Sequence, residues 1–265
     1  MKQLQRLLEI MEALRHPQTG CPWDLEQSYE TIVPHTLEEA YEVAEAIERG
    51  DRAELRDELG DLLFQVVFYA QLAKEEGLFD FDRIAGTVAD KIVRRHPHVF
   101  EDKQETDSES QKRTWEAIKA RERAESGEGV TSALDGVASA LPALTRAVKL
   151  QRRAARVGFD WDSATPVFEK VREELAELEA ELVPDANQDA VEEELGDILF
   201  ACANLARHLG VDPETAVRRT NRKFERRFRR LERLVTDAGG SVDSAGFDVL
   251  EAAYQNAKSE EKESR

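Results

Sequence analysis

The amino-acid sequence predicts an all-α protein composed of two homologous helical-bundle domains. Three observations support this fold class: an internal repeat, apolar residues at helical spacing, and a composition typical of exposed helices. Charged residues make up 35% of the 265 residues and aromatic residues 7%, with only 14 glycines and 8 prolines. A β-sandwich or β-barrel would need more turn residues, so the composition argues against an all-β fold.

The repeat centres on a seven-residue motif that occurs once in each half of the chain. The segment ELGDLLF at 58–64 recurs as ELGDILF at 194–200, with six of the seven residues identical. The segment CPWD at 21–24 precedes the first copy, and FDWD at 159–162 precedes the second. Because chance would rarely reproduce several motifs in the same order, the two halves are interpreted as homologous.

The division between the halves is expected at a Gly/Ser-rich break that follows a charged helix. We expect one domain at 1–125 and a second at 137–265, joined by a linker at 126–136. A new helix is expected to begin near Leu134.

Apolar residues in each half predict antiparallel helix pairs with short connections. The residues at 37–47 and at 55–67 follow the spacing i, i+3, i+4, i+7, and Gly50-Asp51 separates the two stretches. The segment 184–187 separates the corresponding helices of the second half. Each half is therefore expected to be a small bundle. Further helices are expected at about 81–95 and 213–236, with Trp23 and Trp161 as core or helix-entry anchors.

The charge balance limits the partners of the chain. A formal net charge of −18 repels nucleic-acid phosphates and anionic membrane surfaces, and it also repels a nucleotide that arrives without a cation. No apolar run is long enough to span a membrane, and the first helix lacks the apolar core of a signal peptide. We therefore expect a cytoplasmic protein with no membrane partner. The only cysteines, Cys21 and Cys202, do not form a disulfide framework or a metal motif.

Each half carries two pairs of carboxylates at i, i+3 spacing. Residues three apart share one helix face, so antiparallel packing of the two helices would bring four carboxylates together. Such a group repels itself unless a divalent cation compensates the charge. Oxygen ligands suit Mg²⁺, with Mn²⁺ as the second choice, and such ions bridge to substrate phosphates. The candidate metal ligands are Glu39, Glu42, Glu58 and Asp61 in the first half, and Glu174, Glu177, Glu194 and Asp197 in the second.

Two alternatives to this metal site were weighed. A single Glu pair at this spacing is commonly part of a solvated helix surface. Two such pairs at the same positions of both halves are not explained in this way. The glycine inside each Glu-Leu-Gly-Asp motif also suggests close approach of another helix or a ligand, because a mid-helix Gly costs about 1 kcal/mol relative to Ala. A di-iron bundle would need a Glu-x-x-His pair, which neither half contains.

The segment 218–233 is strongly basic, with nine Lys or Arg residues and two acids. Nucleic acid is one candidate partner of such a helix. Alternatively, one Lys/Arg pair of the helix can grip a triphosphate beside a metal, and a nearby aromatic ring can stack on a base. A terminal aromatic is more often a packing anchor than a ligand contact. These candidate substrate contacts are Lys223, Arg227, Tyr254 and Lys258, with Lys91, Arg95, Trp115 and Lys119 at the corresponding positions of the first half.

These motifs together resemble the two-domain form of the MazG family of nucleoside triphosphate pyrophosphohydrolases. The resemblance covers nearly the whole chain and includes TLEEAYEVAEAI at 36–47, DELGDLLFQVVFYAQ at 57–71 and RRHPHVF at 94–100. It implies an all-α fold, magnesium at the carboxylates, and hydrolysis of canonical and altered nucleoside triphosphates to the monophosphate and pyrophosphate. It also implies a homodimer.

The resemblance assigns the main activity to the second half. It implies that Glu174, Glu177, Glu194 and Asp197 hold the metal, that Lys223 and Arg227 contact phosphates, and that Tyr254 and Lys258 lie at the base end. Two positions depart from the family pattern. Tyr254 stands where relatives often have Trp, and Ala190-Val191 stands where relatives can carry a nucleotide-contacting Lys.

The expected chemistry is attack of a metal-associated water on the α-phosphorus, with Glu173 or Glu193 as candidate proton acceptors. The alternative function is a nucleotide-sensing regulatory dimer in which one or both metal sites do not turn over substrate. The net charge of −18 and the place of the basic helix in the repeat argue against a nucleic-acid partner.

Overall fold

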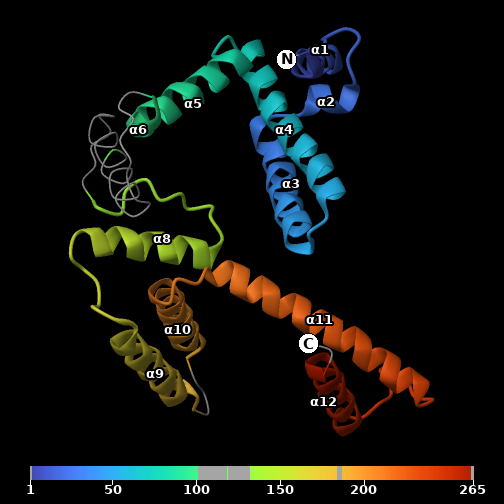
Figure 1. Ribbon diagram of the computed structural model, residues 1–265, viewed down its shortest axis with the longest axis vertical. Coiled ribbons are helices and arrows are strands. Elements are labelled where there is room, and N and C mark those ends of the chain that lie inside the picture. Colours follow the sequence, from blue (N-terminus) through green and yellow to red (C-terminus); the bar gives the residue numbers. More distant parts are fainter. Residues whose placement is uncertain (1, 101–117, 119–131, 184–186, 264–265) are drawn as a thin grey trace. The chain divides into compact units, whose positions relative to one another are not determined.

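The computed structural model describes residues 2–100, 118, 132–183 and 187–263, and no strand occurs among them. The all-α fold is thereby confirmed (Figure 1). The chain divides into two compact units, Met1–Ser126 and Gly127–Arg265. None of the described helices is both long and apolar enough to span a membrane.

The described part of the first unit consists of helices joined by short turns. The central pair, α3 and α4, packs together, α1 packs on α4, and α5 packs on the far end of α4. The elements are α1 (Lys2–Leu14), α2 (Pro22–Glu26), α3 (Tyr29–Arg49), α4 (Arg52–Glu75), α5 (Phe81–Arg95) and α6 (Pro97–Phe100).

The second unit repeats the central helix pair as α9 and α10, and α8 packs on α10. Helix α12 packs on the long basic helix α11. The expected helices at 81–95 and 213–236 are confirmed as α5 and α11. The elements are α8 (Ala143–Arg156), α9 (Ala164–Glu181), α10 (Gln188–His208), α11 (Pro213–Asp237) and α12 (Phe247–Glu263).

The expected helical start near Leu134 is wrong, because the first described helix after it begins at Ala143. Residues 132–142 instead form turns. Gly136 adopts a left-handed conformation with φ of 77°, and Pro142 immediately precedes the helix. Both features are incompatible with a continuous α-helix through this segment.

Local capping sets the turn between α3 and α4. Gly50 ends α3 with a left-handed φ of 74°, a conformation that residues with a side chain rarely adopt. The Asp51 carboxylate then accepts hydrogen bonds from the backbone N–H groups of Ala53 and Glu54 at 3.0 and 3.1 Å. Asn187 begins α10 in the same way, accepting from the N–H of Asp189 at 3.1 Å. These caps make both helix pairs antiparallel hairpins.

The core of the first unit lies where α1, α3 and α4 meet. It contains Met11, Ile32, Val67, Phe68 and Leu72. The second unit has smaller clusters among its described residues: Ala147, Val148 and Ala203 join α8 to α10, whereas Leu231, Val235 and Ala253 join α11 to α12.

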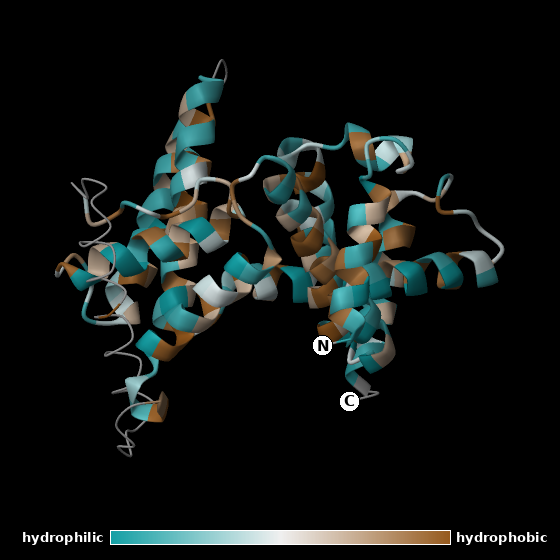
Figure 2. Cartoon of the chain, turned by 90° about the horizontal axis from the view of Figure 1, so that it is seen from above, coloured by the Kyte–Doolittle hydropathy of each residue, from teal (hydrophilic) through white to brown (hydrophobic). Residues whose placement is uncertain are grey.

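Most of the apolar stripe on each helix pair is not buried in the single chain. Large apolar side chains on α3 and α4, and on α9 and α10, remain exposed by 38% or more. Figure 2, which colours the chain by hydropathy, shows apolar and polar residues interspersed along the helices. The hairpin of each unit therefore does not cover its own apolar surface. These side chains are Val33, Leu37, Tyr41, Ile47, Leu59 and Leu63 in the first unit, and Phe168, Leu175, Leu195, Leu199 and Phe200 in the second.

The two tryptophans expected as core or helix-entry anchors are exposed, Trp23 by 53% and Trp161 by 42%. The core alternative is therefore wrong, whereas Trp23 does lie in the first turn of α2. In α2 it is Asp24 that is buried, and Trp23 points to the outside.

A buried arginine clamps α1, α2 and α4 together. The guanidinium of Arg15 donates to both carboxylate oxygens of Glu75, with the shortest bond at 2.8 Å, and to the backbone carbonyl of Asp24. It also lies over the ring of Phe68, 5.3 Å from the centroid. Arg15 is only 8% exposed. Truncation of its side chain would therefore leave the groups that accept its hydrogen bonds without a donor.

We predict that Arg15→Ala lowers the free energy of unfolding by about 2 kcal/mol, because the variant leaves the buried carbonyl of Asp24 without its donor and breaks the partly exposed ion pair with Glu75. Arg56→Ala is the control, since its pair with Asp57 is exposed by 78% and 62%. That variant should change stability by no more than about 0.5 kcal/mol. Urea unfolding followed by circular dichroism measures both, and equal effects of the two variants would contradict the clamp.

Candidate functional site

The first acidic cluster lies across the hairpin of α3 and α4. One carboxylate oxygen from each of Glu39, Glu58 and Asp61 lies within 4.8 Å of the others. Glu39 comes from α3, and the other two lie one turn apart on α4. The spacing of three residues and the antiparallel packing together produce this convergence.

The second acidic cluster has the same construction on α9 and α10. Oxygens of Glu174, Glu194 and Asp197 again lie within 4.8 Å of one another. Glu174 is only 5% exposed. The Oε2 atom of Glu194 is buried, and it has no hydrogen-bond partner among the described residues. A buried carboxylate oxygen without a donor is a chemically suitable ligand for a cation.

The electrostatics of both clusters reflect burial and like charge. Burial is the largest cause that raises the pKa of Glu39, Glu58 and Glu194, and the neighbouring carboxylates raise it further. A divalent cation would remove this repulsion and allow all the carboxylates to ionise.

The fourth carboxylate of each predicted set lies beside its cluster. Glu42 and Glu177 are both exposed. A hydrogen bond with Glu42 is among the causes that raise the pKa of Glu39. In the second unit, a hydrogen bond with Glu174 is the largest cause that raises the pKa of Glu177. Both residues are therefore close enough to join a metal site after a side-chain rotation.

A lysine that the sequence analysis missed lies against the second cluster. Lys170 Nζ lies 2.7 Å from Glu174 Oε1 and 2.9 Å from Glu173 Oε1. These hydrogen bonds raise the pKa of Lys170, so the ammonium stays charged. The i, i+4 spacing from Lys170 to Glu174 was the available signal. His35 lies four residues before Glu39, at the corresponding position of the first unit.

The predicted proton acceptors flank the second cluster on the same helices. Glu173 and Glu193 are both exposed and immediately precede Glu174 and Glu194. Glu173 is already paired with Lys170. Glu193 raises the pKa of Glu194 through its charge, which shows that it lies near the cluster.

The two motif glycines do not mark a close approach of another helix within the chain. A Cβ atom built at Gly60 or Gly196 would meet no described atom within 4 Å. Of the two expected neighbours, another helix or a ligand, a helix from the described part of this chain does not pack there. Both glycines are exposed, beside Leu59 and Leu195 of the apolar stripes.

The basic and aromatic residues of the second unit form a group of their own between α11 and α12. The Nε of Arg227 donates to Glu261 Oε2 at 2.7 Å, and Arg226 donates to Glu261 Oε1 at 2.7 Å. These hydrogen bonds lower the pKa of Glu261 to about 2. The Tyr254 ring lies 6.0 Å from that of Phe224. Sequence reasoning missed Glu261, because the pairing joins two helices.

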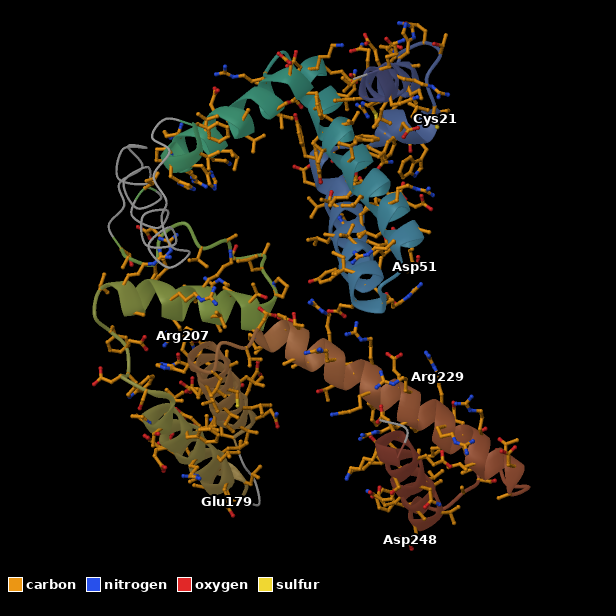
Figure 3. The ribbon with its side chains drawn as sticks, in the orientation of Figure 1. Cys21, Asp51, Glu179, Arg207, Arg229 and Asp248 are labelled. Carbon is orange, nitrogen blue, oxygen red and sulfur yellow. The ribbon has the colours of Figure 1, made fainter. Side chains whose placement is uncertain are left out.

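The remaining residues predicted to contact substrate lie on α11, α12 and α5, or outside the described residues. Lys223 and Lys258 are half-buried on α11 and α12 (Figure 3 shows these helices with Arg229 and Asp248 labelled). In the first unit, Lys91 and Arg95 are half-buried on α5, whereas Trp115 and Lys119 lie outside the described residues.

Within one chain, the structure does not bring the group on α11 and α12 to the acidic cluster on α9 and α10. Helix α11 begins beside α10, but its later turns and α12 diverge from the pair α9 and α10 (Figure 1). The two groups of predicted site residues therefore stay separate in the single chain.

The sequence segments that carry the two acidic clusters are similar to those of known proteins. A family model for the MazG nucleotide pyrophosphohydrolase domain matches residues 27–100 and again 163–231. The chain is 51% identical over 262 residues to the Escherichia coli K12 protein named nucleoside triphosphate pyrophosphohydrolase, covering 98% of this chain and 99% of that protein. It is 41% identical over 254 residues to the Thermotoga maritima protein named nucleoside triphosphate pyrophosphohydrolase/pyrophosphatase MazG, covering 96% and 95%. This chain therefore belongs to the MazG nucleotide pyrophosphohydrolase family.

Proposed function

We propose that this protein is a magnesium-dependent nucleoside triphosphate pyrophosphohydrolase. It converts a canonical or altered nucleoside triphosphate and water to the monophosphate and pyrophosphate. The observation that carries the proposal is the convergence of three carboxylates from two helices in each unit, in a chain similar over its full length to proteins of that name.

The donor set fits Mg²⁺, with Mn²⁺ as the alternative. It consists of carboxylate oxygens, which hard divalent ions prefer, and the buried Oε2 of Glu194 supplies an unpaired ligand atom. Glu174, Glu177, Glu194 and Asp197 would hold the ion in the second unit, and Glu39, Glu42, Glu58 and Asp61 in the first. When bound, the ion neutralises the polyphosphate and activates a water.

The residues of the second unit take the other roles. Glu173 or Glu193 accepts the proton of the attacking water, since both flank the cluster. Lys223 and Arg227 stabilise the charge that develops on the leaving pyrophosphate, and Tyr254 with Lys258 contacts the base end. Lys91, Arg95, Trp115 and Lys119 are the counterparts in the first unit. We place the main activity in the domain at 137–265, after a linker at 126–136, and a regulatory role in the domain at 1–125.

The arginines of α11 favour this role over nucleic-acid binding. Arg226 and Arg227 pair with Glu261, and Arg230 makes two hydrogen bonds with Glu260 at 2.7 and 2.9 Å. Two carboxylates of α12, Glu260 and Glu261, thus offset part of the positive charge that a nucleic acid would need.

A homodimer completes this proposal. The exposed apolar stripe of the hairpin α9 and α10 is the kind of surface that a second hairpin covers in a four-helix bundle. The exposed motif glycines lie beside this stripe, where a partner helix can approach closely. A second copy could also carry its α11 and α12 to the acidic cluster that one chain leaves without them.

Three glutamate variants test the activity and its location. The full-length protein is incubated with each nucleoside triphosphate and Mg²⁺, and the monophosphate and pyrophosphate are measured. We expect Glu194→Gln to reduce kcat by at least about 100-fold, because it removes a metal ligand, and Glu58→Gln to leave most activity. Glu179→Gln is the matched control, an exposed glutamate on α9 outside the cluster (Figure 3). Release of the diphosphate and orthophosphate, or full activity of Glu194→Gln, would contradict the mechanism.

The increase in Tm that Mg²⁺ causes should depend on pH. The folded-state pKa values of Glu39, Glu58 and Glu194 are raised, so the stability that these groups contribute is present below their unfolded pKa and is lost as pH rises through the folded pKa. We expect Mg²⁺ to raise Tm by several degrees at about pH 7.5 and hardly at about pH 4.5, where the carboxylates bind protons instead.

Thermal scans with MgCl₂, against NaCl at equal ionic strength, measure this increment. The double variant Glu58→Gln/Glu194→Gln should lose it. An equal increment at both pH values, or in the double variant, would mean that the metal binds elsewhere.

The proposed dimer is tested by a charge in its interface. We predict that Leu199→Glu, at a site 51% exposed on α10, shifts the protein from dimer to monomer, because the new carboxylate would be buried without a partner. Leu78→Glu, 65% exposed in the turn after α4, should leave the dimer intact. Sedimentation equilibrium gives both masses, and a monomeric parent protein would refute the proposal.

A further inference from the structure

We propose that Trp23 and His35 form the nucleobase-binding face of the first unit, in place of Trp115 at the position that corresponds to Tyr254. The first unit would then bind a magnesium nucleotide beside its acidic cluster. The inference rests on the proposed function, because it takes the carboxylates of Glu39, Glu58 and Asp61 as the phosphate-binding end of the site.

The first observation is the rigid support behind an exposed indole. Helix α2 has only five residues. Its position is nevertheless fixed, because the Arg15 guanidinium donates to the Asp24 carbonyl of α2 and also to the carboxylate of Glu75 in α4. Asp24 is buried, and the side-chain amide of Gln27 donates to the carbonyl of Trp23 at 2.8 Å. The local structure therefore turns Trp23 outward and holds it there. Preorganised, exposed aromatic side chains are typical of binding surfaces.

The second observation is the ring that lies against this indole. The centroids of Trp23 and His35 are 6.2 Å apart at an interplanar angle of 68°. His35 precedes Glu39 by four residues, so both lie on one face of α3, about 6 Å apart along the axis. The aromatic pair is thus about one helical turn from the carboxylates. A nucleotide, whose base and phosphates are joined through one ribose, has this arrangement of groups.

The apolar stripe of α3 lies on a different face. Val33 and Leu37 are each two residues from His35, which places them on roughly the opposite side of the helix. The ring of Trp23, which lies against His35, is therefore not an extension of the exposed apolar stripe on α3. The chemistry beside it is polar: His35 Nδ1 lies 3.8 Å from Glu38 Oε2, and the imidazole can hydrogen-bond the edge of a base.

The second unit repeats the exposed tryptophan but changes its neighbour. Trp161 follows Asp160, whose carboxylate accepts from Arg207 at 2.9 Å and lies 3.1 Å from His208 Nε2 (Arg207 is labelled in Figure 3). At the position of His35 the second unit has Lys170, which pairs with the acidic cluster. Both units thus expose a tryptophan ahead of the acidic cluster, but its surroundings differ. His35 lies against Trp23, whereas the residue before Trp161 is Asp160, which pairs with Arg207. We therefore assign the nucleobase-binding face to the first unit, where Trp23 and His35 form it.

The experiment isolates the first site in the full-length chain. Glu194→Gln weakens the second metal site, and calorimetry in excess Mg²⁺ then measures binding of a nucleoside triphosphate with a non-hydrolysable α,β-methylene bridge. We expect Trp23→Leu to weaken this binding about tenfold, since base–aromatic stacking is lost, and Trp23→Phe to preserve most of it. Inorganic tripolyphosphate, which has no base, should bind the Trp23→Leu variant as well as its parent.

Trp161→Leu is the matched control, because it removes the corresponding indole of the other unit and should leave first-site binding unchanged. The proposal is overturned if Trp23→Leu does not weaken nucleotide binding, if it weakens tripolyphosphate binding equally, or if the Glu194→Gln protein binds no nucleotide. Pyrophosphate release by the unaltered protein is assayed separately, so a failure of the proposed activity is distinguished from a failure of this site.

Discussion

The mutual repulsion of carboxylates on facing helices is the constraint around which each unit is organised. Glu39, Glu58 and Asp61 come together only because α3 and α4 form an antiparallel hairpin, whose turn is set by Gly50 and capped by Asp51. Burial first, and then the charges of the neighbouring carboxylates, raise the pKa values of Glu39 and Glu194. A cation would convert this repulsion into a favourable interaction, which ties folding stability to the proposed chemistry.

The same hairpins leave apolar surface uncovered, and this feature connects the metal site to assembly. Two helices can align carboxylates, but they cannot enclose a core around side chains such as Leu199 and Phe200. The residues of α11 and α12 that we propose as phosphate contacts are likewise held apart from the cluster of their own unit, with Arg227 paired to Glu261. The proposed dimer would account for both features at once, and a bound nucleotide would have to displace or share the carboxylate of Glu261.

The sequence predicted the helices and the acidic sets well because their signals are local. Carboxylates three residues apart must share a helix face, and Gly50 and Asn187 mark helix ends by their own conformations or hydrogen bonds. It predicted the environment of single side chains poorly. Trp23, expected as a core or helix-entry anchor, is not in the core, and the helix expected near Leu134 begins at Ala143.

By itself, the sequence determined the repeat, the helical class and the spacing of the carboxylates, since repeated motifs and apolar periodicity follow directly from residue order. Its motifs also carried the resemblance to the family, which the comparisons show. Tertiary structure decided which side chains meet across helices: Arg15 with Glu75, Arg227 with Glu261, and the ring of Trp23 with that of His35. Such contacts depend on the rotation and crossing of helices that are separated along the chain. No local pattern encodes that rotation, because it results from the packing of all the helices together.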